Sequence, residues 1–423
     1  GTIENYSTKT ITNNKTIINN SLINNAGIFN NSHTNGVLNN NSIFKNKSSG
    51  TTTNYGEFNV NTGSTFTNIG TLNNTKTSPT ISATFNVIGT LSNQDSGTIV
   101  NNSILENEAN GGITNAGIFN NTGNVIIKAS SIFTNSNTYR NQVAGSDKGL
   151  MDILGTVNNN NLFSNSGTAK VTSGTLNNSS IFNNDDLLII NGDVKLLKTS
   201  NLTNSSVIKV YKLLRNYGTL TNNLTLTTFD SSTLENFNVL TNSSNGTITN
   251  SNNFTNKGLN ATNSDSIDLN GITGTITNSG NIIHSRSSFI NLGVITNQNS
   301  ITNNASLTNG GTITNNSTKT ITNNNIFINN NILDNEGILN NSHSNGIFTN
   351  NLTLNNKSTG TLKNFGTLTI QSPGTITNSG TFNNTKSSAQ INATLTIIGN
   401  FINQANATLL NTADIKNETN GTI

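Results

Sequence analysis

The stretch Gly374-Thr375-Ile376-Thr377-Asn378 decides the fold of this chain, because variants of it recur along almost the whole sequence. Residues 246–250 and 274–278 repeat the same five letters, and Gly27-Ile28-Phe29-Asn30 is one of many looser forms. The repeating unit is about six residues long and reads small residue, Thr, aliphatic residue, variable residue, Asn, variable residue. A period this short is typical of stacked repeats.

Each unit fits one short strand followed by a corner. Side chains of an extended strand alternate between two faces, so the aliphatic residue and the Asn two places later point the same way, and the flanking Thr residues point the other way. One such unit cannot bury its apolar residue alone, whereas stacked copies can. We therefore predict an all-β fold, a parallel β-helix (β-solenoid), in which residues 1–423 form one continuous elongated rod of stacked rungs. A left-handed hexapeptide helix is the alternative, but there the small inward residue usually precedes the aliphatic one.

The composition supports stacked strands over helices or disorder. Asn accounts for 94 of the 423 residues, only 9% of residues are charged, and 31% are hydrophobic. A disordered chain would have few and unpatterned apolar residues, whereas here they are regularly spaced. Frequent Thr, Ile, Val, Asn and Gly also disfavour helix interiors. An AT-rich genome would enrich Lys as strongly as Asn, yet Lys and Arg together number 21.

The inward Asn has a structural role in this scheme. At a corner it can hydrogen-bond the backbone of the turn, and it can also bond its copy one rung away to form a ladder. The predicted ladder residues are Asn222, Asn250, Asn278, Asn315 and Asn378.

A second, larger repeat is also present. Residues 1–113 align without a gap with residues 311–423, and about half of the aligned residues are identical; Asn31-Ser32-His33, for example, returns as Asn341-Ser342-His343. Residues 114–310 are then the remainder of the first copy of a large repeat of about 310 residues. Because the chain covers about one and a third copies, we interpret it as an interior part of a longer protein.

Two stretches depart from the short unit. Residues 138–154 contain the single Met and a charged segment, and we interpret them as a lateral loop or a longer face. Residues 184–215 are richer in Leu, Lys and Asp, and they fit either wider and better-packed rungs or a surface for lateral contact with a neighbouring chain. The candidate contact residues are Asp185, Asp186, Lys209, Tyr211, Lys212 and Arg215.

The residue pattern does not indicate catalysis. Asp185, Asp186 and Asp193 come closest to a carboxylate cluster, but no basic cluster or aromatic sugar platform accompanies them. His33, His284 and His343 are interpreted as surface turn residues rather than ligands. We expect no catalytic residue, no metal and no cofactor.

The charge and hydropathy also argue against two classes of partner. The net charge of +3 is too dilute for nucleic-acid binding, and no apolar run approaches the length of about 18 residues that crosses a bilayer. We therefore predict neither nucleic-acid binding nor membrane insertion in this segment.

The run of residues 218–226, together with residues 374–384, resembles the repeats of filamentous-haemagglutinin-like and autotransporter-type bacterial surface adhesins. This resemblance implies a right-handed parallel β-helix, secretion to the cell surface, and a role in adhesion or biofilms. The chain differs in having Asn where those repeats often have Ala or Gly, and it lacks the amino-terminal secretion domain of that family.

These observations favour a structural protein at the cell surface or outside the cell. We expect an extracellular fibre or a surface-adhesin stalk built from tandem large repeats. Its partners would be itself, by end-to-end or lateral association, or the surface of a host or neighbouring cell. The alternative is an ice-binding β-solenoid that uses outward Thr-x-Thr rows such as Thr275 and Thr277, although Ser, Asn and Lys interrupt these rows.

Overall fold

The structure is a computed structural model. It describes residues 1–32, 35–78, 80–145, 147–257, 274–342, 345–386 and 393–423. All regular secondary structure in these residues is β-strand, arranged as about 19 parallel stacked rungs, which confirms the predicted β-solenoid. The chain divides into two compact units, residues 1–208 and 209–423, and each is described by itself.

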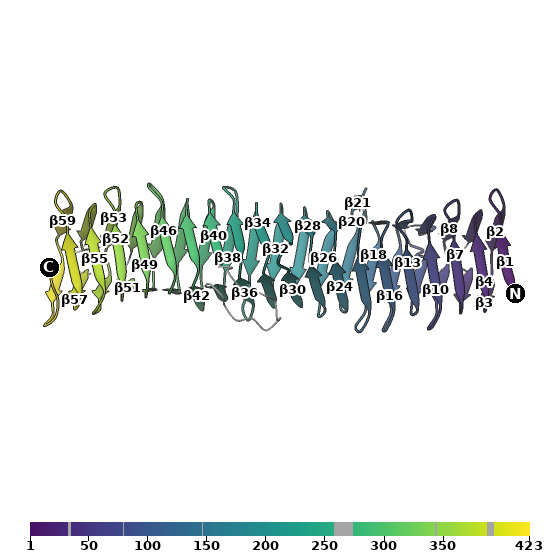
Figure 1. The fold of residues 1–423 in the computed structure, drawn as a ribbon, viewed down its shortest axis with the longest axis horizontal. Coiled ribbons are helices and arrows are strands. Elements are labelled where there is room, and N and C mark those ends of the chain that lie inside the picture. The colour runs from purple at the N-terminus through teal and green to yellow at the C-terminus, as the bar shows by residue number, and fades with distance from the viewer. Residues whose placement is uncertain (33–34, 79, 146, 258–273, 343–344, 387–392) are drawn as a thin grey trace. The chain divides into compact units, whose positions relative to one another are not determined.

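In the first unit the chain coils through three sheets, named A, B and C (Figure 1). Each strand of the coil pairs in parallel with the strand one rung further, which is three places later along the chain, or five places later where a two-stranded hairpin intervenes. Ile3 thus lies opposite Ile23 and Asn5 opposite Asn25. Parallel strands joined in this way form rungs of one strand per sheet. The first two rungs consist of β1 (Thr2–Asn5), β2 (Thr10–Asn13), β3 (Thr16–Asn19), β4 (Leu22–Asn25), β5 (Ile28–Asn31) and β6 (Val37–Asn40).

The second unit is built in the same way, with parallel, in-register pairs such as Leu220 opposite Leu240. The strands from β46 (Thr312–Asn315) to β60 (Asp414–Asn417) match, in the aligned copy, those from β1 to β15 (Ile104–Asn107). The early strands of this unit are β33 (Leu213–Asn216), β34 (Thr219–Asn222), β35 (Thr225–Thr228), β36 (Thr233–Asn236), β37 (Val239–Asn242), β38 (Thr247–Asn250), β39 (Asn253–Asn256), β40 (Thr275–Asn278), β41 (Asn281–His284) and β42 (Ser288–Asn291).

Burial alternates along the strands as the repeat predicts. In β34 the second and fourth residues, Leu220 and Asn222, are fully buried, while Thr219 and Thr221 are partly exposed. Among the described residues, every strand has four residues except the two strands of one hairpin. Most four-residue strands therefore contribute one apolar residue and one corner residue to the inward side; in the strand Thr51–Asn54 the second residue is the buried Thr52.

The second strand position forms the apolar core of each unit. In the first unit, Phe44, Phe58, Phe66 and Phe85 come from different strands and are all fully buried. Their ring centroids lie 4.6–5.7 Å apart in stacked, tilted and edge-on arrangements. Burying each such side chain stabilises the fold by roughly 1.5–3 kcal/mol, and aromatic pairs add to this.

Corners between strands are tight, and some admit only Gly. A Cβ added at Gly117 would lie 2.1 Å from the carbonyl oxygen of Gly97, one rung away. The backbone packs this closely because the N–H of the residue after Gly117 donates to that same carbonyl. Gly at this corner is therefore required by the spacing of the rungs.

The structure corrects the interpretation of residues 138–154 as one lateral loop or longer face. β20 (Thr138–Asn141) and β23 (Leu150–Ile153) are ordinary strands, and their Tyr139 and Met151 side chains are fully buried in the core. Among the described residues of this stretch, only the antiparallel hairpin of β21 (Val143–Ala144) and β22 (Asp147–Lys148) leaves the coil.

Residues 184–215 are also more regular than expected. β29 (Leu187–Ile190), β30 (Asp193–Leu196), β31 (Asn201–Asn204) and β32 (Val207–Val210) have the usual four residues, so the rungs are not widened. The apolar character lies instead at the fourth strand position, where Ile190, Leu196 and Val210 replace the inward Asn and are fully buried.

Candidate functional site

The most extended polar feature of the described residues is a set of buried Asn ladders. In the first unit every strand of sheet B ends in a buried Asn, and each amide nitrogen from Asn13 to Asn184 donates to the amide oxygen of the next rung at 2.7–2.8 Å. The ladder comprises Asn13, Asn31, Asn54, Asn74, Asn101, Asn121, Asn141, Asn165, Asn184 and Asn204.

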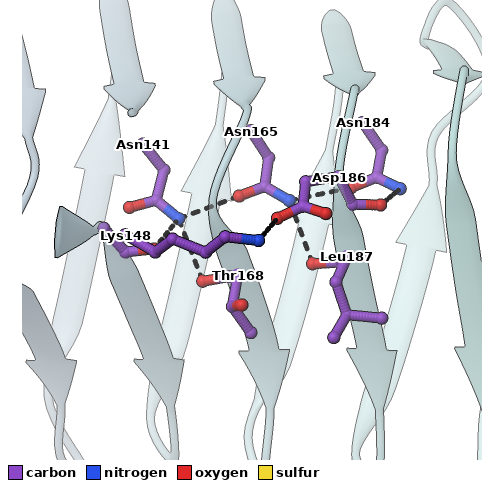
Figure 2. Close-up of polar contacts among 8 residues, drawn as sticks. Asn141, Lys148, Asn165, Thr168, Asn184, Asp186 and Leu187 are labelled. Atoms are coloured by element: carbon purple, nitrogen blue, oxygen red, sulfur yellow. Dashed lines mark hydrogen bonds and ion pairs between the residues drawn. The ribbon is translucent and has the colours of Figure 1, made fainter. Parts of the chain in front are cut away.

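Each ladder Asn also holds the backbone of the corner. Figure 2 shows Asn141, whose Nδ2 donates to Oδ1 of Asn165 at 2.8 Å and to the carbonyl oxygens of Gly149 and Thr168, each at 2.9 Å. Asn165 in turn donates to Asn184 at 2.8 Å and to the carbonyl oxygen of Leu187 at 3.0 Å. Corner carbonyls that would otherwise be buried without a partner are thereby satisfied.

Asn suits this position for a definable reason. Its amide carries both a donor and an acceptor, so identical residues can bond one another along a row. Asp could only accept, and a row of carboxylates about 4.8 Å apart would be strongly repulsive. A run of Asn therefore converts the inner corner into a continuous hydrogen-bonded column.

Sheet C replaces several Asn residues with aliphatic ones, and its corners change accordingly. After Val87, the N–H groups of Ile88 and Gly89 both donate to the carbonyl oxygen of Val60, each at 2.8 Å. The corner after Ile153 repeats this arrangement, with Leu154 and Gly155 bonding to the carbonyl oxygen of Ile127. At these two corners an aliphatic fourth residue is thus combined with a Gly, and the carbonyl of the preceding rung accepts two backbone N–H bonds.

The five predicted ladder residues lie in two sheets of the second unit. Four are in sheet B, and their amides donate to the next rung: Asn222 to Asn242 and Asn278 to Asn297 at 2.9 Å, Asn315 to Asn335 at 2.8 Å, and Asn378 to Asn403 at 2.7 Å. Asn250 lies in sheet C, where its side chain bonds Thr228 at 2.5 Å and His284 at 2.9 Å.

The interpretation of His284 as a surface turn residue is wrong. His284 is the last residue of β41 and is fully buried at a ladder position. Burial lowers the pKa of its imidazole below the ordinary value, and neighbouring backbone groups of Ser287 and Ser306 offset only part of this effect. The sequence signal was available, since His284 stands where the repeat expects Asn. His33 and His343 lie outside the described residues.

The candidate contact residues Asp185 and Asp186 lie at one corner of the first unit. Asp186 pairs with Lys148 of the hairpin at 3.0 Å, as Figure 2 shows, and Asp185 is exposed. The neighbouring hairpin residue Asp147 pairs with Lys76 at 2.7 Å. The hairpin thus contacts the corners on both sides of it through partly exposed ion pairs, which contribute little to stability.

The other four candidates, Lys209, Tyr211, Lys212 and Arg215, belong to the second unit. Arg215 and Lys257 bond Glu235 at 2.7 and 3.0 Å. Burial alone would raise the pKa of Glu235, but these two hydrogen bonds outweigh it and lower the pKa. Tyr211 is 40% exposed and stacks on Phe229, while Lys209 points outward from β32 and Lys212 is an exposed corner residue.

The residues that the structure describes contain no group of three or more His, Cys, Asp or Glu side chains placed to hold a metal ion. They also contain no helix of the length and hydropathy needed to cross a membrane.

The chain is similar to known proteins in its structure but not in its sequence. No family model matches the chain, and no curated protein matches its sequence. Among solved structures, the chain is similar to a crystal structure described as the TibC-catalyzed hyper-glycosylated TibA55-350 fragment, with 12% identity over 98% of this chain and 99% of the other. The TM-score is 0.16, so this likeness carries no argument about function.

Proposed function

We propose that the chain is a non-catalytic structural segment of an extracellular fibre or of the stalk of a cell-surface adhesin, built from tandem large repeats. The observation that carries this proposal is the sheet B ladder, in which each described rung of a unit bonds the next through a buried Asn. Such a column adds the same inter-rung bonds with every rung, so stability grows with length rather than with globular volume.

The large repeat supports the same role. Strands β1 to β15 and β46 to β60 have matching bounds in the two copies, so each copy supplies the same set of strands. Modules of equal length suit a spacer or a polymer. The partners would be further copies, joined end to end or laterally through unpaired strand edges, or the surface of a host or neighbouring cell.

Cryo-electron microscopy of the protein released from its source cells tests this proposal. Long uniform rods with an axial repeat of about 4.8 Å are expected. The proposal would be overturned if the protein formed only short particles without axial assembly and was absent from both the cell surface and the medium.

Ice binding is a second candidate, and one observation favours it. In sheet B of the second unit, five neighbouring rungs present Thr at the third, outward strand position without interruption, and the first position holds only Thr or Val. The uninterrupted row consists of Thr221, Thr241, Thr277, Thr296 and Thr314. This row of five Thr residues is more regular than expected from the sequence, in which Ser, Asn and Lys interrupt the Thr-x-Thr pairs.

An ice-recrystallisation assay separates the two candidates. If the row binds ice, the wild-type protein slows crystal growth and Thr277→Lys, which places a charge in the middle of the row, abolishes the effect. Lys363, an outward residue of another sheet, offers a control through Lys363→Thr. Crystal growth unaffected by the wild-type protein would exclude this function.

A further inference from the structure

One corner of the second unit carries a groove that the structural role does not require. It lies where the chain turns from sheet C to sheet A on successive rungs, and its volume is about 540 Å³. It is lined by Tyr211, Phe229, Asp230, Ser251, Ser285 and Arg286, and we call it the corner groove. Grooves of this size accommodate small ligands.

An aromatic stack forms one end of the corner groove. The rings of Tyr211 and Phe229 lie on adjacent rungs, with centroids 4.3 Å apart and planes inclined by only 6°. The backbone fixes this arrangement, because the N–H of Phe229 donates to the carbonyl oxygen of Val210 at 2.9 Å. Tyr211 is 40% exposed and Phe229 is partly exposed, so the stack is open to solvent.

The next position of the stack holds a small residue. Thr228 and Asn250 are register partners, so Ser251 follows Asn250 at the place where a third ring would stack on Phe229. Ser285 holds the same place one rung further, because Asn250 is the register partner of His284. The small Ser251 side chain therefore leaves space for one flat ring against the free face of Phe229.

Polar groups frame that space. The guanidinium of Arg286 pairs with the carboxylate of Asp230 at 2.9 Å, and this ion pair spans the rung of Ser251. Both side chains are about two-thirds exposed, at 69% and 67%. Together with the hydroxyls of Ser251 and Ser285, they offer several donors and acceptors while their charges cancel.

We propose that the corner groove binds a neutral hexopyranose whose hydroxyls are all equatorial, such as a β-linked glucose residue of a glycan. Such a ring has two apolar C–H faces, so one face stacks on Phe229 while the other lies beneath Arg286. Its rim of hydroxyls meets Asp230, Arg286 and the two Ser residues. This binding site goes beyond the structural role proposed above and does not depend on it.

The same observations disfavour other rings. An axial hydroxyl would project into the Phe229 face, so epimers with one are expected to bind worse. A charged sugar gains nothing from an ion pair whose net charge is zero. An aromatic side chain would stack equally well, but its single polar group would leave most of the surrounding donors and acceptors without new partners.

The test uses cellotetraose and β-1,4-mannotetraose, which differ by one axial hydroxyl per ring. Saturation-transfer NMR with the 423-residue protein should show transfer to cellotetraose, and titration calorimetry should give an affinity about tenfold or more above that for mannotetraose. Equal binding of the two tetrasaccharides, or no binding of cellotetraose, would overturn the proposal.

A variant that fills the space tests the location. Ser251→Phe supplies the missing third ring at an outward corner, so the fold should persist, as circular dichroism can verify, while cellotetraose binding is lost. Lys357→Ala, which removes a partly exposed charge at another corner of the same unit, is the matched control and should bind like wild type. Unchanged binding by Ser251→Phe would refute the assignment to the corner groove.

Discussion

The imidazole Nδ1 of His284 lies 2.9 Å from the amide nitrogen of Asn250, so a histidine occupies a place in an asparagine ladder. Its other ring nitrogen, Nε2, is buried without a hydrogen-bond partner. An imidazole held in this way resists protonation, since the charged form would be desolvated and its protonated Nδ1 could no longer accept a hydrogen bond from the Asn250 amide. The site therefore makes the stability of this rung depend on pH.

Replacing His284 by Asn should remove that dependence. Because the pKa of His284 is lowered in the folded protein, the unfolded chain binds this proton more readily. The stability contributed by the neutral imidazole is therefore fully present above about pH 6.5 and is lost as the pH falls below that value. Thermal unfolding at about pH 8 and about pH 5 should show a larger loss for wild type than for His284→Asn. Equal losses in the two proteins would contradict this reading.

Loss of one ladder residue should be costly. Asn165→Ala removes one of the bonds that the Asn141 amide donates, and it takes away the donor to the Asn184 oxygen and the Leu187 carbonyl. Each buried group that stays unsatisfied costs about 1–3 kcal/mol. Asn183→Ala, at an outward position of β28 (Ile181–Asn184), should stay within about 0.5 kcal/mol. Denaturant unfolding and amide hydrogen exchange of the neighbouring rungs measure the loss of stability in each of the two variants. Similar effects of the two substitutions would argue against a structural ladder.

Two nearby glycines offer a matched pair. Gly117→Ala places a Cβ 2.1 Å from the Gly97 oxygen and 2.4 Å from the Gln94 oxygen, so the rungs must separate. The free energy of unfolding should fall by about 3 kcal/mol. At Gly112, a Cβ would meet nothing within 4 Å, so Gly112→Ala should be neutral or stabilising by up to about 1 kcal/mol. The midpoints of denaturant unfolding measure the stability change of each variant. If Gly117→Ala were as stable as wild type, the corner would be able to relax around the added Cβ.

The hairpin should be removable. Deletion of residues 143–148 leaves Gln142 and Gly149 as a two-residue corner between Asn141 and Leu150, which is the length and the Gly placement of the corner at Ala116 and Gly117. The bond from Asn141 to the Gly149 carbonyl lies outside the deleted part. The shortened protein should keep its β-sheet circular dichroism and unfold at nearly the wild-type temperature. A collapse of the fold would show that the ion pairs of Asp147 and Lys148 matter more than exposed pairs usually do.

The sequence predicted which side chains face inward, because this depends on the alternation along a strand. It did not predict which residues meet on neighbouring rungs, because this depends on the lengths of the corners. Leu220 and Asn222 face inward as expected, because a period of two requires only four residues of strand. The partners of Asn250 were not predictable in the same way, since Thr228 lies 22 residues before it and His284 lies 34 residues after it. These separations depend on how much chain each corner contains, which the six-residue pattern does not reveal. For the same reason the approach of Arg286 to Asp230, 56 residues apart, appeared only in the structure.

Because the ladder bonds of each described rung join it to the rungs beside it, a pull on the chain would release the coil one turn at a time. In the first unit, tension at Asn13 would first break its bond to Asn31 and leave the bond from Asn31 to Asn54 intact. Each turn released would yield roughly 65–70 Å of extended chain from about 20 residues, in exchange for about 4.8 Å of stacked height. A tether made this way would lengthen in equal steps under load and keep the rest of its coil wound.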